Sequence, residues 1–111
     1  MNGNELNTVP ATVLQTMAMQ IEGNVGLVMI RSNDDRAALA AAALWTFARH
    51  TGLDKDGETL DTVLSDFIGN LLHLCDHYDP GGNGEARFST ALQIARMHFE
   101  QEIEEDDSAA W

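Results

Sequence analysis

Apolar residues recur every three or four positions along most of the chain, and this spacing predicts α-helices. Pro10 suits a first helical turn, Ser32 or Asn33 can cap a helix, and Gly52 suits a helix end. We expect four helices, at about residues 10–21, 33–50, 59–78 and 85–103. The predicted fold class is therefore all-α.

A short apolar run, GLVMI at residues 26–30, has the length of a strand. No second strand is evident for it, and a solitary strand is not stable in water. We expect this segment to pack as an extended plug or to open the second helix.

The second predicted helix is rich in alanine, which favours helix and lets neighbouring helices approach closely. Its expected buried face consists of Leu39, Ala40, Ala43, Leu44 and Phe47. Trp45 points nearly opposite to that face. Either the N-terminal helix covers Trp45, or Trp45 is an exposed aromatic anchor that binds a partner.

The last two predicted helices carry the broadest apolar surfaces. Apolar residues cover half of the third helix, so it should contact at least two others. A short loop joins it to the fourth, and we expect an antiparallel C-terminal pair with the second helix packed across it. The prediction is a small four-helix domain over residues 1–105, then an acidic frayed tail, 106–111. The fourth helix carries an apolar stripe of Phe88, Ala91, Leu92, Ala95, Phe99 and Ile103.

Acidic residues dominate the charge. Lys and Arg number 6 against 18 Asp and Glu, a formal net charge of −12. Residues 54–111 hold 14 of the acids against three basic residues. Direct nucleic-acid binding is disfavoured, because phosphate contacts draw on clustered Lys and Arg. This charge would attract a protein partner with a basic surface, with Glu100 and Glu104 in the densest acidic run. Alternatively, the charge serves solubility alone.

The sequence predicts a cytoplasmic location. Cys75 is the only cysteine, so no internal disulfide can form. We see no signal peptide and no apolar stretch of about 18 residues, the minimum for a membrane helix. Cys75 lies on the apolar side of its helix, and we expect it to act as a buried small hydrophobe. No cofactor is expected.

Four polar residues of the third helix line up beside its apolar face: Asp66, Asn70, His73 and His77. They are spaced as one side of a helix requires. We expect them to form a solvated polar face and to be candidate binding residues.

A metal site is the alternative for the two histidines. Residues four apart on a helix bring two imidazoles together. His98 and Glu102, also four apart, could supply further ligands if the last two helices pair. The glutamate that follows the first histidine in a metalloprotease helix is replaced by Leu74, and we expect no metal. No residue is assigned a catalytic role.

Residues 43–102 contain a recurring pattern on the last two predicted helices, carried by Asp66, Asn70, His73, Cys75, Asp76, His98, Phe99 and Glu102. With this pattern the stretch resembles small helical proteins encoded by bacteria, phages and plasmids, for which no activity is established. The resemblance implies a bacterial or mobile-element origin, while the loop DPGGNGE departs from the family's shorter turn.

A more remote likeness is to the all-α NTP pyrophosphatases, which hold magnesium between paired carboxylates on two helices. The stretch LSDFIGNLLHLCD has a spacing of polar and apolar residues similar to theirs. Asn70 stands where those enzymes would need a second carboxylate. The preceding helix has no carboxylate after Asp35.

These patterns favour a non-catalytic acidic protein-binding module, an accessory protein of bacterial, phage or plasmid origin. One alternative is a metal-dependent hydrolase or degenerate NTP pyrophosphatase. A second is a DNA mimic that inhibits a nucleic-acid-binding protein, which would need its carboxylates in ordered rows. The sequence leaves open whether the chain forms a homo-oligomer.

Overall fold

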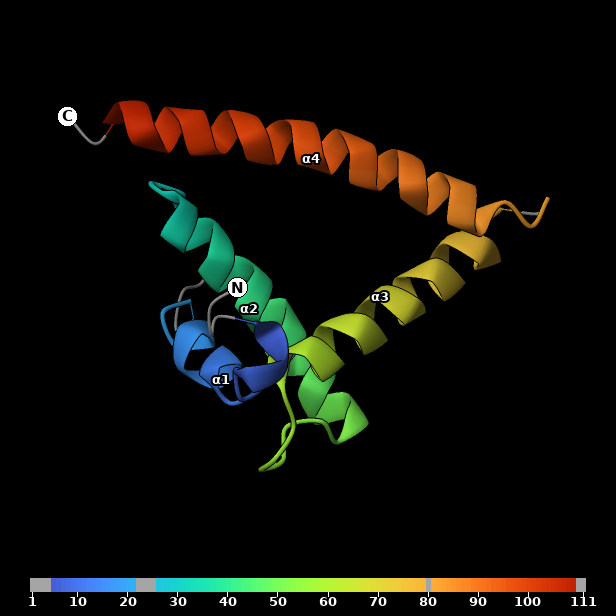
Figure 1. Ribbon diagram of the computed structural model, residues 1–111, viewed down its shortest axis with the longest axis horizontal. Helices are drawn as coiled ribbons and strands as arrows, with labels where there is room; N and C mark the ends of the chain where they lie inside the picture. Colours follow the sequence, from blue (N-terminus) through green and yellow to red (C-terminus); the bar gives the residue numbers. More distant parts are fainter. Residues whose placement is uncertain (1–4, 22–25, 80, 110–111) are drawn as a thin grey trace. The chain divides into compact units, whose positions relative to one another are not determined.

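The computed structural model describes residues 5–21, 26–79 and 81–109, and within them the all-α prediction is confirmed (Figure 1). Trp111, which the sequence leaves open as either folded back or a free anchor, lies outside the described residues. The sole β-type pairing described is an isolated bridge between Pro10 and Thr59. The helices are a 3₁₀ turn η1 (Leu6–Thr8), α1 (Val13–Ala18), α2 (Asn33–Thr51), α3 (Leu60–His77) and α4 (Gly84–Ala109).

The chain divides into two compact units, residues 1–67 and 68–111, and the boundary falls inside α3. The single domain over residues 1–105 stays a prediction. No helix of the described ranges combines the length and the apolar character needed to cross a membrane.

The core of the first unit forms where α1 packs against α2 (Figure 1). Trp45 is only 6% exposed there, and Val63 from the start of α3 is fully buried. Phe47 and Phe67 pack edge to face beside this core, with ring centroids 5.2 Å apart. The buried cluster consists of Ala11, Leu14, Ala18, Ala41, Trp45, Ala48 and Val63.

The buried face of α2 differs from the predicted one. The buried residues are Ala38, Ala41, Trp45 and Ala48, whereas Ala40 and Ala43 are exposed. Small alanine side chains let α1 approach closely enough to cover the indole ring, which has more apolar surface to bury than any other side chain. Trp45 is thus a core residue, and its role as an exposed anchor is excluded in this unit.

The first helix also begins later than Pro10 suggests. The amide of Ala11 donates to the carbonyl of Glu58 (2.9 Å), and the amide of Leu60 donates to that of Val9 (2.8 Å). These two hydrogen bonds hold the chain around Pro10 extended, so α1 begins only at Val13.

The GLVMI segment has no regular secondary structure and does not pack as a plug. Leu27, Met29 and Ile30 are exposed, with Leu27 wholly so. Ser32 then caps α2 by accepting a hydrogen bond from the amide of Asp35 (3.4 Å). The segment therefore neither joins the core nor opens the second helix.

In the second unit, the chain reverses direction between α3 and α4 (Figure 1). The two helices meet at their joint but do not pack along each other, so the close packing expected of the antiparallel pair is not found. As a consequence, Leu92, Phe99 and Ile103 of the apolar stripe on α4 are exposed. The helix continues to Ala109, past the predicted end near residue 103.

Candidate functional site

The polar row predicted on α3 faces water. Asp66, Asn70, His73 and His77 are all exposed. Their spacing of four, three and four places them on one side of the helix. The ring of His77 contacts that of Tyr78 edge to face, with centroids 4.8 Å apart.

The four candidate metal ligands are not brought together. His98 is exposed and Glu102 half-buried, both on α4, and α4 does not pack along α3. In the part of the chain that the structure describes, no three His, Cys, Asp or Glu side chains are grouped to hold a metal ion. The hydrolase and pyrophosphatase alternatives have no assembled centre in these residues.

Two charged residues lock the joint between α3 and α4. Nε of Arg87 donates to Oδ2 of Asp79 (2.8 Å), and the amide of Gly81 donates to Oδ1 (3.0 Å). The Arg87 hydrogen bond, followed by that of Gly81, lowers the pKa of Asp79 below its ordinary value. Gly84 lies against the backbone of Asp76, where a side chain would not fit. Asp79 therefore has a structural role at this joint.

A hollow of about 280 Å³ lies beside this joint. It brings His73 close to two carboxylates, Asp76 and Glu85, and Leu72 and Gly82 complete its lining. All three ionisable side chains are exposed. Water screens charges in such a position, so the hollow offers no buried acid or base.

Cys75 is a free cysteine. It is half-buried, whereas the sequence predicts a fully buried side chain. It borders a second hollow at the joint, together with Tyr78, Asp79 and Arg87. The apolar side of α3 is only partly covered at this end, because α4 does not pack along it.

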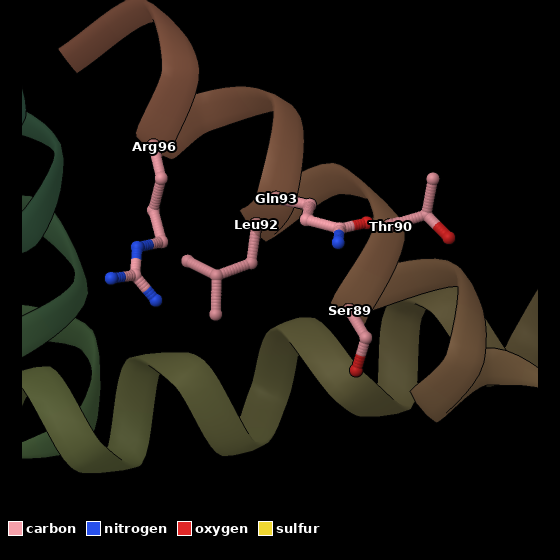
Figure 2. Close-up of a pocket in the computed structure, with 5 residues that line it drawn as sticks. All are labelled: Ser89, Thr90, Leu92, Gln93 and Arg96. Carbon is pink, nitrogen blue, oxygen red and sulfur yellow. The ribbon is translucent and has the colours of Figure 1, made fainter. Parts of the chain in front are cut away.

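Another hollow, on α4, is built from that helix alone. It measures about 300 Å³, and its lining residues are Ser89, Thr90, Leu92, Gln93 and Arg96. Figure 2 shows Leu92 and Arg96 extending to the same side of the helix, while Thr90 points elsewhere. One helix supplies one wall, which cannot enclose a small molecule.

The first unit has an apolar hollow of about 240 Å³. Ala40 and Leu44, from the predicted apolar face of α2, lie in its wall. Every side chain that lines it is Leu, Met or Ala, so it has no group that could carry out acid–base or metal chemistry.

The side of α4 opposite the apolar stripe combines exposed apolar and acidic residues. At about 100° per residue, Ile94, Met97, Glu100, Gln101 and Glu104 share this side. Met97 is 67% exposed and Ile94 50%. We call these five residues the acidic face. It contains both glutamates that the sequence suggested as binding residues.

Sequence reasoning missed the Asp79–Arg87 pair and underrated Met97. The pair forms only once the chain reverses at the joint, which spacing along one helix cannot show. Met97 is an apolar residue off the stripe, but the place of Glu104 beside it becomes clear only on a helix that continues past residue 103.

Comparisons with family models, curated proteins and solved structures gave no match.

Proposed function

We propose that this protein is a non-catalytic protein-binding module, and that its acidic face binds a partner protein with a basic surface. One observation carries the proposal: on α4, Met97 and Ile94 are exposed beside Glu100 and Glu104 in regular helix. Surfaces that mix an exposed apolar centre with charged neighbours are typical of protein interfaces.

The two kinds of side chain would contribute differently. The carboxylates of Glu100 and Glu104 would speed encounter with Lys and Arg of the partner and fix its orientation. Met97 would supply buried apolar area, since its flexible thioether adapts to irregular surfaces. We propose further that the protein is an accessory protein of bacterial, phage or plasmid origin.

The test is affinity capture from a bacterial lysate with matched variants. The double variant Glu100→Gln, Glu104→Gln removes two charges from the acidic face. Its control, Asp54→Asn with Asp56→Asn, removes two charges from the loop before α3. We expect wild type and control to retain the same partner, released as salt rises, and the acidic-face variant to lose it.

A partner retained equally by all three proteins would refute the proposal, because net charge or another surface would then be responsible. Met97→Ala adds an independent check. It leaves the charge unchanged and should weaken capture, whereas Met19→Ala, at an exposed methionine of the first unit, should not.

A DNA mimic is the second candidate, and the length of α4 favours it. Glu100, Glu104, Glu105 and Asp106 belong to a helix that continues to Ala109, so these acids lie in regular helix. A mimic occupies a DNA-binding groove. If the protein is such a mimic, duplex DNA should displace it from its captured partner. If DNA does not compete, the DNA-mimic candidate is refuted and the partner is a protein with a basic surface that does not bind DNA there.

A further inference from the structure

The second unit lacks a core of its own. Among its described residues, Gly84 alone is buried. Yet α4 exposes Leu92 (49%), Phe99 (60%) and Ile103 (41%) along one stripe. A helix with such a stripe gains most of its stability by burying it against another surface. Burial of the stripe against another surface would therefore stabilise α4.

The stripe has the spacing of a helix–helix seam. Phe88, Leu92, Ala95, Phe99 and Ile103 follow one another at intervals of four, three, four and four residues. Intervals of three and four are those of coiled-coil contact positions. At about 1.5 Å per residue, the seam is about 22 Å long.

The pattern is also nearly symmetric about a point between Ala95 and Arg96. If two copies of α4 run antiparallel about that point, Phe88 of one lies level with Ile103 of the other, and Leu92 with Phe99. A two-fold interface requires such self-complementarity, because each surface must fit its own copy.

Charge selects the antiparallel orientation. The part of α4 from Glu100 to Asp106 has five acids in seven residues, whereas residues 84–98 hold Glu85 against Arg87 and Arg96. A parallel pair would bring the two acidic ends together. An antiparallel pair sets each acidic end beside the half of the partner that carries both arginines.

We propose that the apolar stripe of α4 is the interface of a two-fold homodimer in which the two α4 helices pair antiparallel. The acidic face lies on the opposite side of α4 and would stay open in the dimer, once on each copy. The inference stands apart from the proposed function, because each rests on a different side of the helix.

The first test is oligomeric state against concentration, measured by analytical ultracentrifugation on the full chain. We expect the wild type to shift from monomer to dimer as concentration rises. Leu92→Asp buries a carboxylate in the seam and should raise the dimer dissociation constant by about tenfold or more. Met97→Asp makes the same kind of change on the acidic face and should leave dimerisation unaltered.

Two results would overturn the proposal. One is a wild type that stays monomeric at every concentration. In that case, a lower unfolding midpoint for Leu92→Asp would show that the stripe packs within its own chain. The other is a dimer that Met97→Asp disrupts and Leu92→Asp does not. Circular dichroism confirms that each variant retains its helices.

Cross-linking then tests the orientation in a Cys75→Ser background. Ala95→Cys, beside the axis, should form a disulfide between identical copies. Phe88→Cys and Ile103→Cys should each fail to do so alone and should cross-link efficiently when mixed. A parallel pair would give the reverse: each single variant would cross-link with itself, and mixing would add nothing.

Discussion

At the scale of the residue, Trp45 shows how burial decides between two roles for one side chain. The sequence allowed it to be a core residue or an exposed anchor. The structure leaves 6% of it exposed, in a cluster with Leu14 and Ala18 of the first unit. The alanines of α2 make that burial feasible, because their small side chains leave room around the ring for α1 to approach.

Replacement of Trp45 should therefore be costly. Trp45→Ala removes the largest buried side chain from a core whose other buried residues are Ala, Leu and Val. We expect it to lower the free energy of unfolding by about 3–5 kcal/mol, measured by urea denaturation. Met97→Ala, at an exposed position, should change it by about 0.5 kcal/mol or less. Equal effects at the two sites would mean that α1 does not cover α2.

The Asp79–Arg87 pair makes a prediction about pH. The pKa of Asp79 is lowered in the folded state, chiefly by the Arg87 hydrogen bond. The stabilisation from this pair is therefore present above the unfolded-state pKa and is lost as pH falls through the lowered folded-state pKa. Arg87→Ala should raise the pKa of Asp79 toward its ordinary value, as followed by NMR titration of the carboxyl carbon. Arg96→Ala, the matched control, should leave it unchanged.

At the scale of the element, local chemistry explains what the sequence could predict. Ser32 caps α2, Gly52 ends it with a φ of +80°, and Thr59 accepts from the amide of Thr62 at the start of α3. Each signal acts within a few residues, so the bounds of α2 and α3 were predictable. The start of α1 was not, because a bridge to Thr59, far along the chain, holds Pro10 extended.

Two glycines in helices allow a paired prediction. Gly69 lies in α3, and a methyl group added there would meet no neighbouring atom, so Gly69→Ala should stabilise the protein by about 0.5–1 kcal/mol. At Gly84 the same methyl would come within 2.5 Å of the backbone of Asp76. Gly84→Ala should therefore destabilise the joint, by about 1–3 kcal/mol. Thermal unfolding followed by circular dichroism checks both, and equal shifts of the same sign would contradict the close approach at Gly84.

At the scale of the molecule, the surfaces depend on which helices pack together. The sequence placed Glu100, Glu104 and the polar row of α3 on the surface, because charge and spacing suffice for that. It could not establish that α4 leaves its apolar stripe exposed, since pairing is a non-local property. The metal ligand set of His73, His77, His98 and Glu102 depended on that pairing and is not assembled in the described residues.

Binding of a basic partner by the acidic face of α4 can be measured directly. The quantity is the dissociation constant for the purified captured partner at low and high salt, with wild type and with Glu100→Gln, Glu104→Gln. We predict weaker binding at high salt, and weaker binding by the variant at low salt with a smaller dependence on salt. A dissociation constant that neither salt nor the double substitution changes would contradict a role for the acidic face.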